Sequence, residues 1–322
     1  MVQADVVTNL WKNNMIGIKS IASYIPPGRI DNVAQAAEFE RDAAFVDAKL
    51  GTRTLSVKSD AEETSDLCVQ AVQNLLAKNP ALKPEVIEAL IVVTQNGDAE
   101  GLPHTSAIAQ DKLGLPKQIA CFDVGLGCSG YVYGLAIAQG FMQAAGLRNA
   151  VLVTADPYSK IMDRSDRLTT LLFGDAATAT WLGQQPQWVL TASSYGTDGA
   201  GAEYLVTKDG HFHMNGRQVF NFASLKIIPH MQEVLAKAGV DFAEVDAICL
   251  HQGSAAIVDA IAKRLGEHGD KVLKDMFGAG NTVSSSIPLL LEHYVLDSDY
   301  QQVLMSGFGV GLSWASGLLS RV

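Results

Sequence analysis

The sequence has few cysteines, and their spacing is not that of a metal site. Cys68, Cys121, Cys128 and Cys249 form no Cys-x-x-Cys pair, the usual signature of zinc or dithiol chemistry. This spacing argues against a metal centre. In a cytoplasmic protein such thiols stay reduced, and packing in the core is the simplest interpretation for Cys68, Cys121 and Cys249.

Long apolar runs are missing as well. No run approaches the ~18 residues that a transmembrane helix needs, so we expect no membrane span. Residues 1–14 lack the basic, apolar and small-residue regions of a secretory signal peptide. We therefore interpret residues 1–14 as a short N-terminal extension and predict a cytoplasmic protein.

Positive charge is in deficit. The chain has 24 lysine and arginine residues against 34 aspartate and glutamate residues, which gives a net charge of −10. So acidic a chain is a poor partner for nucleic acids. The 322 residues are 48% hydrophobic, which is enough for one large core or for two domains.

Apolar runs that suit buried strands alternate with amphipathic runs that suit helices. The strand-like runs cover residues 89–94, 150–155, 247–252 and 302–309, and helical patterns cover residues 65–79 and 224–239. This alternation predicts a layered α/β fold.

The two halves of the chain follow the same order of elements. Each half has a strand, a helix ending in KLG or RLG, a second strand, a turn of small residues and a further helix. We interpret this as an internal repeat, with halves at residues 15–185 and 186–322. Cys128 and Asn281 fall at equivalent turns, and His251 ends a strand. A pseudo-twofold axis would bring these three residues together.

Cys128 lies in the turn "FDVGLGCSG", where a helix begins. The N–H groups and the positive dipole end of a helix favour a thiolate, so we expect this thiol to ionise more readily than a free cysteine. Such N–H groups can also bind an oxyanion. Plainer interpretations exist: Cys128 as core filling, His251 as a structural histidine and Asn281 as a helix N-cap.

The order of the motifs is characteristic of one family. In chain order they are "FDVGLGCSG", "DRSDRLTTLLFGDAATATWL", "HFHMNGRQVFNFA", "LHQGS", "GNTVSSSIP" and "GFGVGLSW". On these motifs the chain resembles the β-ketoacyl-acyl carrier protein synthase III group of the thiolase-like superfamily, from about Met15 to Val322. The resemblance implies two similar βαβαβαββ halves in a five-layer αβαβα arrangement, and a homodimer.

The resemblance also implies a chemistry. Cys128 would attack an acyl thioester, and the backbone N–H groups of Cys128 and Val310 would bind the oxyanion. His251 and Asn281 would hydrogen-bond the carbonyl of a malonyl thioester while CO2 leaves, and the carbanion would attack the acyl group. The substrates would be an acyl-CoA and malonyl-ACP or malonyl-CoA. Acyl carrier protein would be the partner, and no metal or bound cofactor would be needed.

Substrate-binding positions follow from the same resemblance. The residues implied to contact coenzyme A, pantetheine or the carrier protein are Phe45, Lys49, Arg53, Arg167, Lys263 and Arg264. Leu102 stands where acetyl-specific relatives carry an aromatic residue that caps the acyl pocket of the partner subunit. A pocket for a medium-length acyl chain is therefore predicted. Asp175 in "FGDAATAT" is expected to be structural.

Several positions depart from the family pattern. Val310 stands where glycine is usual, Ser254 and Ala256 replace an asparagine and an arginine, and Asn221 replaces a lysine. The lost cations belong to the docking face, so recognition of primer or carrier is expected to differ. Gln95 stands where hydroxymethylglutaryl synthases carry glutamate, and "GFGVGLSW" lacks the second cysteine of degradative thiolases. Decarboxylative condensation is therefore favoured.

Two other functions stay open. The chain could be a non-condensing acyltransferase that passes the acyl group from Cys128 to another nucleophile. It could also be a non-catalytic partner of a condensing enzyme, although such subunits usually lose the nucleophile. Release of CO2 from a malonyl thioester distinguishes condensation from the first alternative, and an acyl adduct on Cys128 excludes the second.

Overall fold

The computed structural model describes residues 15–322, so the extension predicted for residues 1–14 lies outside the described range. The main strands fall into two sets of five. The first set is β1 (Ile16–Tyr24), β4 (Ala89–Val93), β5 (Ala120–Val124), β6 (Asn149–Ala155) and β7 (Ala177–Gln184). The second set is β8 (Trp188–Thr197), β11 (Ala247–Leu250), β12 (Val272–Leu273), β13 (Gln302–Gly309) and β14 (Ser313–Arg321).

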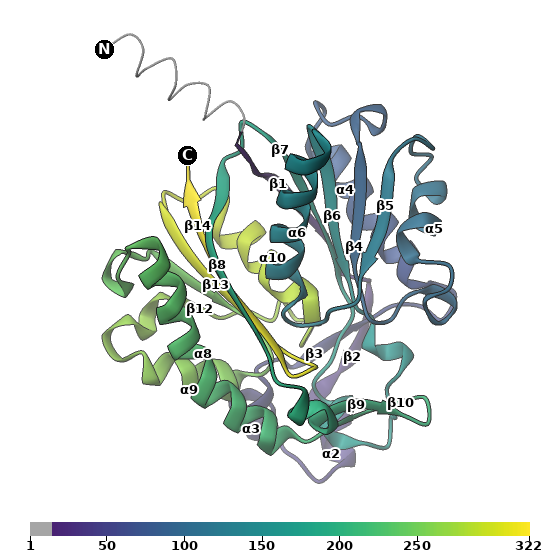
Figure 1. The fold of residues 1–322 in the computed structure, drawn as a ribbon. Helices are drawn as coiled ribbons and strands as arrows, with labels where there is room; N and C mark the ends of the chain where they lie inside the picture. Colours follow the sequence, from purple (N-terminus) through teal and green to yellow (C-terminus); the bar gives the residue numbers. More distant parts are fainter. Residues whose placement is uncertain (1–14) are drawn as a thin grey trace.

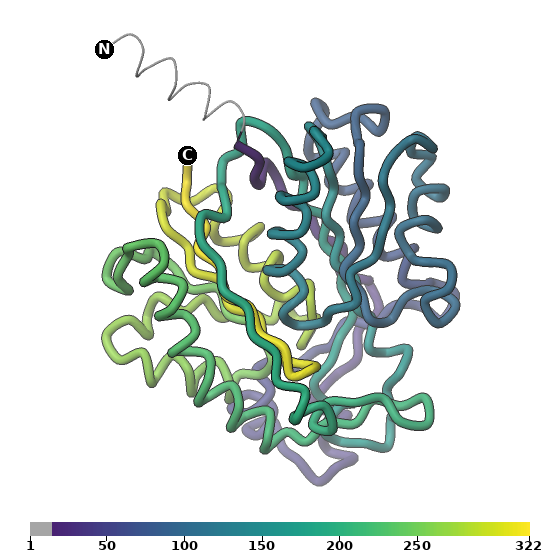
Figure 2. The backbone as a smooth tube through the Cα atoms, in the orientation of Figure 1, coloured from purple at the N-terminus to yellow at the C-terminus, as the bar shows by residue number. Residues whose placement is uncertain are grey.

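These strands form one sheet whose order is the same when counted outward from its centre (Figure 1). The order is β12–β11–β13–β14–β8–β1–β7–β6–β4–β5. The inner strands β1 and β8 meet at Ile18 and Trp188. The C-terminal strand runs beside the segment near residue 190, as Figure 2 shows in yellow and teal. A pseudo-twofold axis between β1 and β8 therefore relates the halves, as the internal repeat predicts.

Helices cover both faces of each half-sheet. The helices of the first half are α4 (Thr64–Lys78), α5 (Thr105–Lys112) and α6 (Gly130–Ala145). Those of the second half are α8 (Gly216–Ala238), α9 (Ala255–Arg264) and α10 (Ser286–Leu290). Each half thus has the order βαβαβαββ. None of the helices in residues 15–322 combines the length and the hydropathy that a membrane crossing requires.

The central core lies between the two half-sheets. Leu135 of α6 and Leu290 of α10 share one cluster of buried side chains with Ile91 of β4 and Met305 of β13. The outer faces are covered separately, by α4 and α5 on one half and by α8 and α9 on the other. Because side chains alternate along a strand, Leu90 packs outward while Ile91 packs inward. The result is the five-layer αβαβα arrangement.

Smaller elements border the end of the sheet where the central helices begin. They are the hairpin β2 (Gly28–Asp31) and β3 (Thr54–Val57), the helices α2 (Asn32–Glu38), α3 (Ala43–Phe45) and α7 (Arg167–Thr170), the helical turn η1 (Val46–Leu50), and the hairpin β9 (Leu205–Lys208) and β10 (His211–Met214). Phe45 of α3, Val219 of α8 and Phe212 of β10 belong to one apolar cluster with Cys128. These insertions therefore enclose the region around Cys128.

The central layer predicts where mutation is most costly. Leu135 is 1% exposed in α6, and its replacement by alanine leaves a cavity between two rigid half-sheets. We expect Leu135→Ala to lower the free energy of unfolding by about 2 to 5 kcal/mol. Leu225, 64% exposed in α8, is the control: Leu225→Ala should change stability by less than about 0.5 kcal/mol. Equal losses in urea titrations would contradict this placement of the core.

Candidate active site

Cys128 lies in the turn between β5 and α6, two residues before the helix begins, and is 7% exposed. The end of β13 packs directly on this turn. A Cβ at position 309 would stand 2.8 Å from Sγ of Cys128, and one at position 307 would collide with its carbonyl oxygen. Gly307 and Gly309 therefore let a strand of the second half approach the thiol of the first half.

His251 follows directly after β11 and is buried. Its Nδ1 lies 2.8 Å from Oγ of Ser286, which is also 3.0 Å from the Val283 carbonyl oxygen. Because Nδ1 is hydrogen-bonded to Ser286, Nε2 is the ring nitrogen that is available to a ligand. Burial lowers the pKa of His251 to about 4, so the imidazole is neutral at neutral pH.

Asn281 is held in the turn that leads to α10. Its Oδ1 accepts the N–H of Val283 at 2.9 Å, and its Nδ2 donates to the carbonyl oxygen of Gly253 at 3.3 Å. These two hydrogen bonds fix the orientation of the Asn281 amide, because one partner is a donor and the other is an acceptor. The side chain satisfies a backbone donor near a helix start, as an N-cap would, yet a second amide hydrogen stays available.

The three residues line one narrow pocket. Most of the remaining lining is apolar: Tyr158, Leu172, Phe173, Leu205, Phe212, Met214, Val219, Ile257, Phe308 and Val310. Sequence reasoning named Cys128, His251, Asn281 and, for its N–H group, Val310, but missed the other apolar residues. Their spacing resembles that of any buried segment, so no sequence signal separates a pocket wall from a core.

Burial dominates the electrostatics of the thiol. Burial first, and then the negative charge of Asp156, raises the pKa of Cys128 to about 12. Hydrogen bonds from the backbone N–H groups of Cys128 and Val310 act in the opposite direction but are outweighed. The expectation that the helix terminus makes Cys128 ionise readily is therefore wrong for the resting protein. The two N–H groups that contact the sulfur are nevertheless those expected to bind an oxyanion.

Comparison with known proteins identifies the family. Residues 122–203 match the family 3-oxoacyl-[acyl-carrier-protein] synthase III, and residues 235–321 match its C-terminal part. A beta-ketoacyl-[acyl-carrier-protein] synthase III from Deinococcus deserti is 34% identical over 320 residues, which is 94% of this chain and 91% of the relative. The chain belongs to the 3-oxoacyl-[acyl-carrier-protein] synthase III family.

Further relatives agree. The Listeria monocytogenes synthase III is 33% identical and covers 93% of this chain and 97% of its own length. The solved synthase III of Thermus thermophilus has a TM-score of 0.87 at 31% identity, with 95% and 99% of the two chains covered. A priming β-ketosynthase of the R1128 polyketide pathway has a TM-score of 0.84 at 26% identity, with 96% and 97% covered. The chain is thus a condensing acyltransferase of the synthase III type.

The residues expected to bind coenzyme A or carrier lie outside the pocket lining. Phe45 is half-buried, and Lys49 is exposed in η1, which packs against α9. Arg53 is exposed and bound through two nitrogens to Asp47 at 2.8 and 2.7 Å. Lys263 and Arg264 are exposed in the last turn of α9, the helix whose Ile257 lines the pocket. Phe45, Lys49, Lys263 and Arg264 therefore lie on segments next to the pocket.

Four other positions are now located. Arg167 is half-buried at the start of α7, next to β10. Leu102 is 85% exposed and contributes nothing to the pocket of its own chain. Gln95 is exposed and accepts a hydrogen bond from the Tyr158 hydroxyl at 3.3 Å. Asp175 is buried and accepts the N–H of Lys58 at 3.0 Å, which fits a structural residue.

The raised pKa of Cys128 has a direct kinetic consequence. Below the pKa the thiolate fraction rises tenfold per pH unit. The rate of Cys128 alkylation by iodoacetamide should therefore rise about tenfold per unit from pH 7 to pH 9.5, without a plateau. Peptide mapping by mass spectrometry checks this, with Cys128→Ala as the control for site assignment. A plateau below pH 8 would show that the thiol ionises readily after all.

Proposed function

We propose that this protein condenses an acyl-CoA with a malonyl thioester, carried by acyl carrier protein or coenzyme A, through an acyl group on Cys128. The observation that supports this most is the convergence of Cys128, His251 and Asn281 on one pocket. The hydrogen bonds from the N–H groups of Cys128 and Val310 to the sulfur add to it. No metal ion and no bound organic cofactor is required.

In the first step Sγ of Cys128 attacks the acyl carbonyl carbon. The N–H groups of Cys128 and Val310 hydrogen-bond the oxyanion that forms. The C–S bond to coenzyme A then breaks with its electron pair on the leaving sulfur. Because the resting thiol is protonated, its proton leaves with coenzyme A, which departs as a thiol. The products are acyl-Cys128 and free coenzyme A.

In the second step a malonyl thioester enters beside the acyl group. Nε2 of His251 and Nδ2 of Asn281 donate hydrogen bonds to its thioester carbonyl. For Nε2 to donate, Nδ1 must accept, and the Ser286 hydroxyl 2.8 Å away supplies that hydrogen when it turns from the Val283 carbonyl oxygen, to which it donates at 3.0 Å in this structure. The bond to the carboxylate breaks, CO2 leaves, and the electron pair becomes an enolate. The enolate attacks the acyl carbon, and Cys128 leaves as a thiolate that regains a proton from water.

The space available for the acyl chain continues beyond the pocket. Tyr158, Phe212 and Val310 line the catalytic pocket on one side and a second pocket on the other. Gln95 and Asn96 join this second cavity to a third, which is open to the surface. We propose that a medium-length acyl chain passes between these side chains toward the outer cavities.

We also propose a homodimer in which Leu102 caps this space in the partner. The edge strand β5 has a neighbour in the sheet on one side, and its Asp123 borders the third cavity together with Glu100 and Gly101. Pairing of two β5 edges about a twofold axis would place the exposed Leu102 of one copy near the outer cavities of the other. A strand edge that has no sheet neighbour among residues 15–322, next to an exposed leucine, fits such an interface.

Acylation of Cys128 is the first test. Intact-protein mass spectrometry after mixing with a ladder of acyl-CoAs should show one acyl adduct on the wild type and none on Cys128→Ala. Cys121→Ala, which removes a half-buried thiol on β5, is the matched control and should keep the adduct. An adduct that persists in Cys128→Ala would remove Cys128 from the mechanism.

Release of CO2 tests the second step. Asn281→Ala should keep acyl transfer to Cys128 but lower CO2 release from a malonyl thioester by about 100-fold or more, because one enolate donor is lost. Gln232→Ala, on the exposed side of α8, is the control and should keep both activities. A wild type that acylates but releases no CO2 would favour the non-condensing acyltransferase.

Chain length tests the acyl pocket and the role of Leu102 together. We expect octanoyl-CoA to acylate the wild type at least as well as acetyl-CoA does. Leu102→Phe should shift the preference toward acetyl-CoA about tenfold, because the larger ring fills the space that the chain would use. Leu225→Phe, at an exposed site on α8, should leave the ratio unchanged. A strong wild-type preference for acetyl-CoA would refute the medium-chain proposal.

A further inference from the structure

Asp156 is a buried carboxylate that follows directly after β6 and lies outside the pocket lining. Its Oδ1 accepts the N–H of Gln95 at 2.7 Å and faces the Thr94 hydroxyl at 3.4 Å. Its Oδ2 accepts the Ser284 hydroxyl at 2.7 Å. All these partners are donors, so the site suits a carboxylate, which only accepts, and would not suit an amide.

The partners of Asp156 belong to two turns that are far apart in the sequence. Thr94 and Gln95 follow β4 in the first half, whereas Ser284 lies in the turn that carries Asn281 in the second half. Asp156 is therefore a bridge across the pseudo-twofold axis. Beside it, the Ser285 hydroxyl lies 2.8 Å from that of Thr154 and within reach of the Thr154 carbonyl.

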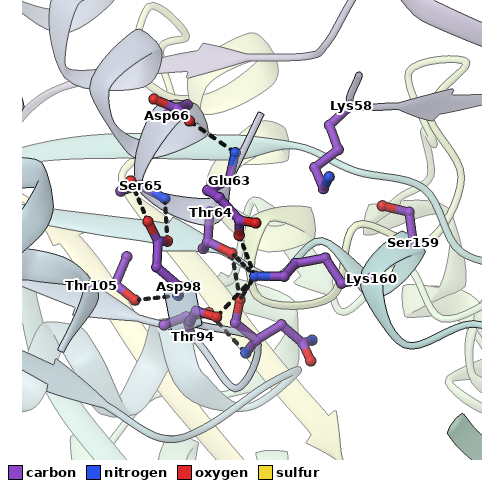
Figure 3. Close-up of polar contacts among 12 residues, drawn as sticks. Lys58, Glu63, Thr64, Ser65, Asp66, Thr94, Asp98, Thr105, Ser159 and Lys160 are labelled. Atoms are coloured by element: carbon purple, nitrogen blue, oxygen red, sulfur yellow. Dashed lines mark hydrogen bonds and ion pairs between the residues drawn. The ribbon is translucent and has the colours of Figure 1, made fainter. Parts of the chain in front are cut away.

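The turn after β4 is firmly held on its other side, as Figure 3 shows. Nζ of Lys160 donates to the Gly97 carbonyl oxygen at 2.9 Å and forms an ion pair with Glu63 at 2.6 Å. The Thr64 hydroxyl donates to the carbonyl oxygen of Asn96. Asp156 thus connects the Asn281 turn to a part of the first half that is already fixed.

The Asn281 turn needs such support because its backbone is strained. Val283 has a φ of +52°, a left-handed conformation that β-branched residues rarely adopt and that costs about 1 to 3 kcal/mol. The N–H of Val283 bonds Oδ1 of Asn281, and the next residue, Ser284, bonds Asp156. Release of Ser284 would let the turn relax and would move the Asn281 amide.

We propose that Asp156 is a positioning residue for the active site, which holds the strained Asn281 turn against the first half so that the Asn281 amide faces Cys128. This inference rests on the proposed function for what Asn281 does. It assigns a role to a residue that touches no substrate.

The charge of Asp156 also has an effect that can be measured separately, on the pKa of Cys128. Asp156 raises the pKa of Cys128, of the neighbouring Tyr158 hydroxyl and of the buried Cys68. Burial raises the pKa of Asp156 itself to about 6, and the bonds from Gln95, Ser284 and Thr94 act in the opposite direction. The carboxylate is therefore ionised at pH 7.5 and above. Its removal should make the Cys128 thiol more acidic.

Two variants separate the effect of the hydrogen bond between Ser284 and Asp156 from the effect of the Asp156 charge. Ser284→Ala removes the bond to the Asn281 turn and keeps the charge, whereas Asp156→Asn removes the charge and disturbs the bond. Both should lower kcat for condensation by about 10- to 100-fold, since a displacement of about 1 Å has that effect. Only Asp156→Asn should speed Cys128 alkylation at pH 8, by about 3- to 10-fold, through a lower thiol pKa.

Asp175→Asn is the matched control because Asp175 is an equally buried aspartate that does not contribute to the pKa of Cys128. It should lower thermal stability without changing alkylation at Cys128. Condensation is measured on holo acyl carrier protein loaded with malonate, and circular dichroism confirms that each variant is folded. Ser284→Ala loses one hydroxyl only, so it keeps the test valid if Asp156→Asn does not fold.

Wild-type kcat in a folded Ser284→Ala variant would overturn the proposal, and so would unchanged Cys128 alkylation in Asp156→Asn. Failure of the proposed function gives a different result, since the wild type itself would then release no CO2. The alkylation measurement does not depend on the reaction that the enzyme catalyses.

Discussion

The Cys128 turn and the Asn281 turn, which meet at the pocket, are each supported by a strand end from the other half of the molecule. The Cys128 turn of the first half packs on Gly307 and Gly309 of β13. The Asn281 turn of the second half is bonded through Ser284 and Ser285 to the end of β6. Because the two half-sheets are joined at β1 and β8 and filled by α6 and α10, neither turn can move without the other half. The geometry of the site is a property of the whole core.

The crossed arrangement places Cys128 and His251 at a mostly apolar pocket, and burial there determines their charge. A buried thiol and a buried imidazole both prefer their neutral forms, as the pKa values of about 12 for Cys128 and about 4 for His251 reflect. In the proposed mechanism, oriented N–H groups and amides take the place of a preformed ion pair. A malonyl carboxylate would be poorly solvated in such a pocket, which favours its loss as CO2.

Much of the fold could be predicted from the sequence because its signals are local. The apolar runs at residues 89–94 and 150–155 became β4 and β6, and the helical pattern at 65–79 became α4. The repeated order of strand, helix and small-residue turn predicted the equivalence of Cys128 and Asn281. The acidity of Cys128 could not be predicted in this way. A helix terminus is a local feature, whereas desolvation depends on β13 and the hairpin insertions that close over the thiol.

The sequence by itself determined the family, the two-fold repeat of elements and the three polar residues that meet at the pocket. These follow from residue types at fixed places along the chain. Only the tertiary structure decided which apolar residues line the pocket and that the thiol rests protonated. It also revealed that Asp156, an ordinary aspartate at a strand end in the sequence, joins the turn after β4 to the Asn281 turn. The reason is physical: burial and hydrogen bonding across the pseudo-twofold axis arise between residues more than a hundred positions apart, such as Asp156 and Ser284.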